Sequence, residues 1–177
     1  MSLKHAILVL LETEPSSGYD LLKQFKNSLG YFWNAKHQQI YQQLKHLSSE
    51  GLIECRLEKQ AGKPDKKVYK ITTSGVTELS SWLTEPVSPN KINDALLVKI
   101  YGGHLTLSRN LLSELEDHLI LHQTTLLQLK EIEHKYLSLS KNLQKKYQLP
   151  YITLRRGILG EEAWLQWANE AIKMIKK

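Results

Sequence analysis

Apolar residues recur at helical spacing in three runs within the first fifty positions. The runs extend from Leu3 to Leu11, from Leu22 to Leu29 and from Ile40 to Leu47, and each places its apolar residues on one helical face. Breakers separate the runs, namely Pro15, Gly18, Gly30 and Gly51. We therefore predict three short helices, the second capped by Ser17 and the third spanning about residues 35–50.

Between residues 53 and 72 the spacing changes from helical to alternating. Ile53, Cys55 and Leu57 alternate with charged residues, which is typical of a half-buried strand. Residues 68–72 are rich in β-branched and aromatic side chains, and a turn containing glycine and proline precedes them. The two segments predict a β-hairpin, followed by a helix over residues 73–83.

Pro86 and Pro89 mark a domain boundary, so we expect one domain at residues 1–85 and a second at residues 86–177. The second domain is helical in composition, and part of it carries an apolar repeat in steps of three and four. We predict one helix over about residues 108–148, roughly 60 Å long, which needs a partner to cover its repeat. The expected dimer interface consists of Leu112, Leu115, Leu119, His122, Leu126, Leu129, Trp164 and Trp167.

The predicted fold is therefore mainly α with a small β-hairpin. Three helices followed by a hairpin are the order of a winged helix-turn-helix, and the helical second domain is expected to dimerise in a coiled-coil-like manner. Hydrophobic residues make up 41% of the 177 positions, enough for a folded core. With one cysteine, no apolar run of membrane-spanning length and no secretory signal, we expect a cytoplasmic protein without a membrane partner.

Positive charge adds a candidate partner. The 24 basic residues outnumber the 18 acidic ones, and the net charge of +6 suits an anionic ligand. Residues 36–70 hold eight bases and four acids, whereas charges over residues 86–177 appear interleaved as on a solvated helix surface. The first cluster therefore predicts a nucleic-acid interface.

The residues expected to contact double-stranded DNA lie on the third helix and in the hairpin, or wing. Opposite the apolar face of the third helix lie polar side chains able to reach base edges in the major groove. The wing concentrates lysines that suit phosphates, and two residues at the entry to the third helix suit a phosphate as well. The predicted set is Asn34, Lys36, Gln38, Gln39, Gln42, Lys45 and His46, with Lys59, Lys63, Lys66 and Lys67 in the wing.

The first domain contains several short motifs in a fixed order, namely Gly18-Tyr19-Asp20, Ile40-Tyr41-Gln42-Gln43-Leu44, Glu50-Gly51-Leu52-Ile53 and Tyr69-Lys70-Ile71-Thr72. In this order the motifs resemble the PadR family of transcriptional regulators. Two further stretches, Gly30-Tyr31-Phe32-Trp33 and Asn93-Asp94-Ala95-Leu96-Leu97, are similar to the AphA-like, virulence-activator branch. The resemblance implies a winged helix, a helical dimerisation domain and a role in binding promoters as a repressor or activator.

The sequence also allows other hypotheses about function. Some PadR proteins respond to small aromatic molecules, so a ligand-responsive repressor is one alternative, and Trp164 and Trp167 are candidates to line its cavity. A protein-interaction adaptor built on the long helix is another. His118 and His122 have metal-ligand spacing, but we expect packed or surface histidines there, no cofactor and no enzymatic activity. The aromatic run Tyr31-Phe32-Trp33 is expected to fill the core.

Overall fold

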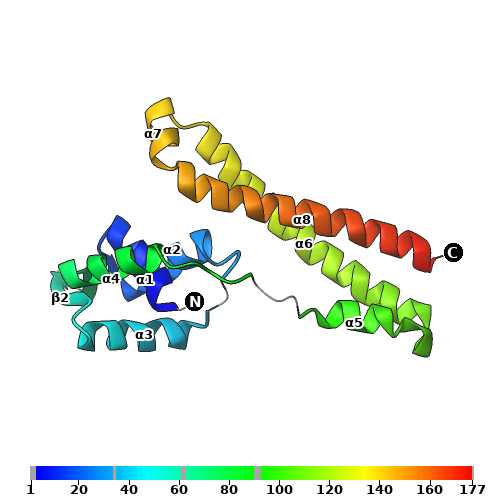
Figure 1. Ribbon diagram of the computed structural model, residues 1–177, viewed down its shortest axis with the longest axis horizontal. Coiled ribbons are helices and arrows are strands. Elements are labelled where there is room, and N and C mark those ends of the chain that lie inside the picture. The colour runs from blue at the N-terminus through cyan, green and yellow to red at the C-terminus, as the bar shows by residue number, and fades with distance from the viewer. Residues whose placement is uncertain (1–2, 34, 61–62, 90–92, 177) are drawn as a thin grey trace. The chain divides into compact units, whose positions relative to one another are not determined.

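The computed structural model describes residues 3–33, 35–60, 63–89 and 93–176, and of residues 60, 63 and 64 it describes the backbone alone. The chain divides into two compact units, residues 1–89 and 90–177 (Figure 1). This division falls close to the boundary expected from the sequence.

The first unit contains four helices around a common core, with a small sheet at one side. Every predicted helix of this region is present. The elements in chain order are α1 (Leu3–Thr13), β1 (Ser16–Ser17), α2 (Gly18–Ser28), α3 (His37–Ser49), β2 (Ile53–Gln60), β3 (Lys63–Ile71) and α4 (Thr73–Leu83). The fully buried side chains include Ile7, Leu8, Leu11, Leu21, Ile40, Leu44 and Leu47. The predicted face of α3 is confirmed, whereas the faces of α1 and α2 are rotated slightly, because Leu8 and Leu21 are buried in place of the half-buried Leu10 and Leu22.

Backbone conformation explains one glycine of the first unit and a close approach of the backbone explains another. Gly51 follows α3 with φ of 70°, the left-handed conformation in which helices commonly end. Gly75 lies in the first turn of α4, where a Cβ atom would collide with the Leu52 carbonyl. Thr72 caps this helix, accepting a hydrogen bond from the Gly75 amide at 3.1 Å. Both glycines thus allow the chain to turn tightly on either side of the wing.

A polar clamp fixes the end of α3 to the rest of the unit. Lys4 Nζ lies 2.8 Å from the Glu78 carboxylate on α4 and 3.8 Å from Glu50 at the end of α3. The hydrogen bond from Lys4 lowers the pKa of Glu78. Beside this pair, the His5 ring stacks on Trp82 with 4.3 Å between ring centres. Helices α1, α3 and α4 are therefore joined by charge as well as by apolar packing.

The sheet has three antiparallel strands in the order β1, β3, β2. The hairpin was predicted, but β1 was not, because a two-residue strand of serines carries no alternation. Ser16 pairs with Tyr69 and Ser17 with Val68. The expected buried face of β2 is also shorter than predicted: Ile53 is buried, whereas Cys55 and Leu57 are exposed. The strand therefore leaves the core just after Ile53, and the rest of it projects as a wing.

The aromatic run before α3 is only partly in the core. Trp33 packs against the core cluster, as expected, but Phe32 is 56% exposed, so the prediction of core filling is wrong for this residue. The residue between this run and the helix, Asn34, lies outside the described residues.

The second unit is an antiparallel helical hairpin with a short helical segment before it. Helix α5 (Ala95–Tyr101) and a single 3-10 turn, η1 (Gly103–Leu105), lead into α6 (Ser108–Leu137). The short helix α7 (Lys141–Lys146) reverses the chain, and α8 (Gln148–Ile175) returns beside α6 (Figure 1). The prediction of one helix over residues 108–148 is wrong, because α6 ends at Leu137 and the chain folds back on itself.

Helices α6 and α8 bury their facing apolar side chains within the chain. Leu115, Leu129, Ile158 and Ala168 are each at most 1% exposed. At Gly157 a Cβ would lie 3.4 Å from Leu129 Cδ1, an ordinary packing distance, so Leu129 packs on the backbone of α8 at this glycine. In the part of the chain that the structure describes, no helix is long and apolar enough to cross a membrane.

Candidate nucleic-acid interface

Helix α3 presents a polar face to solvent. Ile40, Leu44 and Leu47 are buried on one side, which leaves Gln38, Gln42 and Lys45 exposed on the other. The helix carries no acidic residue along this face before Glu50. Because amide and ammonium groups can pair with base edges and phosphates, the face is chemically suited to a major groove.

Two of the predicted residues on α3 already have partners in the chain. The Gln39 side-chain oxygen accepts a hydrogen bond from the Lys36 amide at 2.8 Å and so holds the first turn of the helix. His46 Nε2 lies 3.8 Å from the Glu50 carboxylate one turn later. The Lys36 side chain is exposed at the helix entry. Gln39 and His46 therefore take part in the structure of α3 itself.

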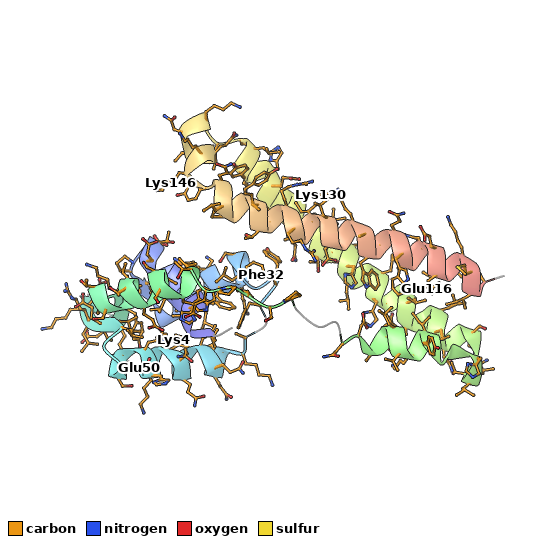
Figure 2. The ribbon with its side chains drawn as sticks, in the orientation of Figure 1. Lys4, Phe32, Glu50, Glu116, Lys130 and Lys146 are labelled. Carbon is orange, nitrogen blue, oxygen red and sulfur yellow. The ribbon has the colours of Figure 1, made fainter. Side chains whose placement is uncertain are left out.

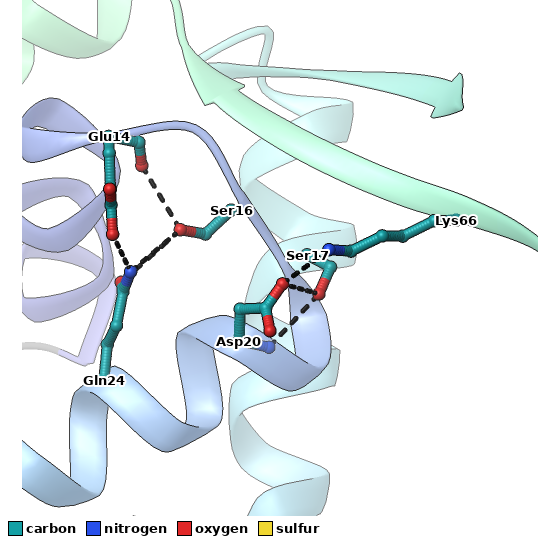
Figure 3. Close-up of polar contacts among 6 residues, drawn as sticks. All are labelled: Glu14, Ser16, Ser17, Asp20, Gln24 and Lys66. Atoms are coloured by element: carbon teal, nitrogen blue, oxygen red, sulfur yellow. Dashed lines mark hydrogen bonds and ion pairs between the residues drawn. The ribbon is translucent and has the colours of Figure 1, made fainter. Parts of the chain in front are cut away.

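The lysines of the wing differ in exposure and in pairing. Lys59 and Lys67 are exposed, and no ion pair joins either to a described residue. Lys66 instead donates to the Asp20 carboxylate at 2.7 Å (Figure 3). The side chain of Lys63 lies outside the described part of the structure. The four wing lysines thus do not form one uniform patch.

Asp20 connects the wing to the start of α2. Ser17 caps α2 by accepting a hydrogen bond from the Asp20 amide at 3.1 Å, and its hydroxyl donates to the Asp20 carboxylate at 2.8 Å (Figure 3). The hydrogen bond from Lys66, together with the one from Ser17, lowers the pKa of Asp20. The same carboxylate raises the pKa of Lys66. This arrangement, which we call the Asp20 lock, fixes β3 of the wing to the start of α2.

A second polar group holds the short strand β1. Gln24 donates from its side-chain amide to the Ser16 hydroxyl at 3.2 Å and to the Glu14 carboxylate (Figure 3). Ser16 in turn lies within 3.4 Å of the Glu14 carbonyl oxygen. The segment between α1 and α2 is therefore tied at both of its serines.

Two tyrosines that the sequence analysis did not select stand beside the wing. A hollow in the first unit is lined by the start of α2, by Tyr41 of α3 and by the wing residues around Lys67. Tyr19 and Tyr41 are both exposed there. Gly18 permits this arrangement, because a Cβ at that position would lie 2.7 Å from the Tyr41 ring. The glycine and tyrosine of the Gly18-Tyr19-Asp20 motif were signals that could have located this part of the surface.

Comparison with known proteins places the chain in a family. Residues 7–81 match the transcriptional regulator PadR-like family, and residues 92–176 match the virulence activator alpha C-terminal family. The negative transcriptional regulator PadR of Bacillus subtilis is 36% identical over 99% of this chain and 98% of its own length. This chain belongs to the PadR family. It is a transcriptional regulator of a DNA-binding family, whose members are regulators rather than enzymes.

Solved structures of PadR-family proteins share the whole fold. Bacillus subtilis PadR in complex with operator DNA superposes with a TM-score of 0.80 at 34% identity, covering 98% of each chain. The Vibrio cholerae virulence activator AphA gives a TM-score of 0.79 at 32% identity, covering 99% of this chain and 98% of its own. A complex of Bacillus subtilis PadR with p-coumaric acid matches at 31% identity over 99% of this chain and 96% of the other, with a TM-score of 0.72. The winged helix with C-terminal helices, predicted from the sequence, is confirmed.

The residues predicted at the dimer interface of this PadR-family chain differ in accessibility. Leu115 and Leu129 are buried against α8 of the same chain, so no surface remains for a partner to cover. Trp164 stacks on His122, whose ring lies 3.6 Å away between centres, and His122 also contacts the Glu161 carboxylate at 2.5 Å. The other members are half-buried, namely Leu112, Leu119, Leu126 and Trp167. For these the interface stays a prediction.

Two histidines of α6 are used in packing against α8. His118 and His122 both lie beside Trp164, at 6.2 and 3.6 Å between ring centres. Among the described residues, no group of three or more possible ligands is placed to hold a metal ion.

Proposed function

We propose that this chain acts as a homodimer that binds double-stranded DNA at specific sequences. In this proposal α3 of each copy enters a major groove and the wing contacts the adjacent backbone. The observation that carries the proposal is the exposed Gln38, Gln42 and Lys45 face on a helix whose other side is locked into the core. The operator complex of a relative with the same fold supports the choice of DNA as partner.

The exposed groups of the wing, α2 and α3 suit phosphates. Lys59 and Lys67 present ammonium groups that pair with no acidic side chain of the described residues, while Tyr19 and Tyr41 present phenolic hydroxyls beside the hollow that Lys67 also lines. Lysines that neutralise phosphates release counterions, which makes binding depend steeply on salt. Lys66 contributes differently, because Asp20 already neutralises it and holds it against the start of α2.

Exposed apolar side chains of the second unit support the homodimer. Val98 and Tyr101 on α5 are 72% and 92% exposed. Ile120, Leu121 and Leu127 are exposed on α6, away from the seam with α8. A second copy that covers such residues would bury apolar area, which is the main source of stability in obligate homodimers. A two-fold dimer presents two α3 helices to one duplex and therefore recognises a pseudo-palindrome.

Selection from a random duplex pool tests the proposal. The full chain is expected to enrich one pseudo-palindromic sequence at two salt concentrations, with two chains per duplex by mass in solution. Gln42→Ala is expected to relax the preference at one position of each half-site, since it removes a base contact. A pool that stays random would instead favour the adaptor function, in which the winged helix is only a scaffold.

Control of DNA binding by a small aromatic molecule is a second candidate. It is favoured by the p-coumaric acid complex of Bacillus subtilis PadR, which covers almost the whole of this chain. Titration with a panel of phenolic acids, followed by tryptophan fluorescence and by release of the selected duplex, tests it. Quenching together with release is expected for an effector; release by none of the panel would contradict this second candidate and leave the first intact.

A further inference from the structure

Positive charge is concentrated where the helical hairpin reverses direction, although acidic and basic residues are mixed over the second unit as a whole. Between residues 134 and 160 the chain has six basic residues and no acidic one, an excess equal to the net charge of the whole chain, +6. The segment comprises the end of α6, all of α7 and the first half of α8. We call it the basic corner. Its bases are Lys135, Lys141, Lys145, Lys146, Arg155 and Arg156.

Only part of this charge is neutralised within the chain. Lys135 pairs with Glu131 at 2.9 Å, and Arg155 pairs with Glu133 at the same distance. The remaining four bases are exposed, and no acidic side chain of the described residues lies at ion-pair distance from them: Lys141, Lys145, Lys146 and Arg156. Figure 2 labels Lys146 where α7 meets α8. The corner therefore offers uncompensated ammonium and guanidinium groups.

Exposed apolar side chains run through the same corner. Leu149, Ile152 and Leu159 are 75%, 55% and 52% exposed. With Arg156 they follow one another at steps of three, four and three along α8, so they share one outward strip of that helix. Leu137 and Leu143 are exposed nearby in the chain. The strip thus combines three apolar side chains with one guanidinium group on α8, and the unpaired lysines lie next to it on α7.

The corner is held in place by its own contacts. The Tyr136 and Tyr151 rings stack with 4.0 Å between centres, and the Tyr136 hydroxyl donates to the Gln144 carbonyl at 3.0 Å. The Gln144 amide donates to the carbonyls of Leu137 and Leu139, each at 3.0 Å, at the end of α6. A surface that is already ordered loses little conformational entropy when it binds.

We propose that the basic corner is a docking site for an acidic amphipathic helix of another protein. Such a helix offers carboxylates to the four unpaired bases and apolar side chains to the strip of α8. The charge argues against a second copy, because a two-fold contact would place like charges opposite one another. A DNA backbone offers no apolar surface to the leucines, and Arg156 interrupts the continuous apolar face that a lipid surface would take.

The proposal goes beyond DNA binding, since it uses none of the residues assigned to the nucleic-acid interface. In the proposed mode of binding, the apolar strip contacts the apolar face of the partner helix, and the charged groups beside the strip select a partner of opposite charge. A regulator with this surface would engage DNA with one unit and an acidic protein segment with the other.

A synthetic peptide tests the site. The probe is a fluorescent helix-forming peptide of about 20 residues, with leucine at helical spacing on one face and glutamate on the rest. Anisotropy is measured with the full chain, beside a scrambled peptide of identical composition. The intact amphipathic peptide is expected to bind about tenfold tighter or more, because only it can align apolar and acidic groups with the corner. Equal binding of both peptides would overturn the proposal.

Charge reversal locates the binding. Lys145→Glu combined with Lys146→Glu is expected to weaken peptide binding about tenfold or more. The matched control is Lys26→Glu with Lys173→Glu, two exposed lysines outside the corner that give the same change in net charge. Ile152→Ser reports on the apolar strip and is expected to weaken binding as well. Equal losses in the two double variants would overturn the proposal.

Further measurements distinguish the proposed partner from a second copy of the chain, DNA and a membrane. The K145E/K146E chain is expected to keep the mass in solution and the duplex affinity of the parent chain. A shift in mass would assign the corner to a second copy, and loss of duplex affinity would assign it to DNA. Preferential binding of the parent chain to vesicles of anionic lipid over the peptide would assign it to a membrane. Each of these results would overturn the proposal, and none depends on whether α3 reads a specific sequence.

Discussion

Asp20 gives two adjacent lysines of the wing different roles. Lys66 is held by the Asp20 carboxylate at 2.7 Å, whereas Lys67 is exposed and pairs with no acidic side chain of the described residues. Since Asp20 also takes part in capping α2 with Ser17, the carboxylate joins a helix start to a strand that is distant in sequence. The positive charge available for phosphate is therefore smaller than the number of lysines suggests.

Salt dependence distinguishes these two lysines. Lys67→Ala is expected to weaken duplex binding and to lower the slope of log affinity against log salt by about 0.9, the value for one lost phosphate contact. Lys66→Ala is expected to leave the slope unchanged, because its charge is already neutralised by Asp20. Binding isotherms at four salt concentrations measure both. An equal drop in slope for the two variants would show that Lys66 leaves Asp20 to contact the phosphate.

Acid unfolding tests the Asp20 lock. The folded state lowers the pKa of Asp20, so the carboxylate stabilises the fold above the ordinary pKa of aspartate and loses this contribution as the pH falls through the lowered value. Below about pH 4 we therefore expect the free energy of unfolding to fall less in Asp20→Asn than in the parent chain. Urea unfolding at several pH values measures it. Parallel pH profiles for the two proteins would contradict the lock.

The sequence predicts exposure at this scale better than it predicts partners. Gln38, Gln42 and Lys45 are exposed because helical geometry places them opposite Ile40 and Leu44. The pairing of Lys66 with Asp20 joins residues 46 positions apart and leaves no local pattern that could reveal it. Tyr19 and Tyr41 were likewise missed as site residues: both stand in motifs of the sequence, but only the fold brings them to one hollow.

Two glycines show how closely the elements of the first unit approach one another. At Gly75 an added Cβ meets the Leu52 backbone, which cannot rotate away. At Gly18 the Cβ meets the end of the Tyr41 side chain, which is partly exposed and free to turn. The same substitution therefore has different costs at the two positions.

Alanine at the two glycines tests this difference. Gly75→Ala is expected to lower the free energy of unfolding by about 1–3 kcal/mol, as overpacking commonly does. Gly18→Ala is expected to cost less stability while moving Tyr41 and weakening duplex binding. Urea unfolding and binding isotherms measure the two effects. Equal destabilisation by both substitutions would contradict the account.

The second unit shows what an apolar repeat leaves undecided. The repeat on α6 correctly marks a stripe that must be covered, and Leu115 and Leu129 on it are fully buried. Periodicity does not tell whether the covering helix comes from the same chain, and here α8 supplies it. The break between α6 and α7 was missed because Ser138 and Ser140 are weak helix breakers compared with glycine or proline.

Substitutions at two leucines of α6, Leu127 and Leu129, distinguish packing within the helical hairpin from contacts of the proposed dimer. Leu129→Ala is expected to lower the free energy of unfolding by about 2–5 kcal/mol, because it opens a cavity against α8. Leu127→Asp changes an exposed residue and is expected to leave the fold intact while shifting the dimer towards monomer. Unfolding and mass in solution measure the two outcomes. A Leu127→Asp chain that remains dimeric at low concentration would move the interface to another face.

At the scale of the whole molecule, the two units present different kinds of surface. The first unit presents a polar helix and a wing, and the second presents unpaired apolar and basic surfaces. The proposed function joins them, because a dimer built by the second unit sets the distance between two copies of α3. The spacing of DNA half-sites is then a property of the protein rather than of either domain alone.

The affinity for duplexes of varied half-site spacing tests this claim most directly. The half-site found by selection is placed in inverted pairs, and the separation is increased one base pair at a time. Affinity is expected to peak at one separation, fall when half a helical turn is added, and recover in part near about 10 further base pairs, with two chains per duplex. Equal affinity at every spacing, or one chain bound per duplex, would contradict the account.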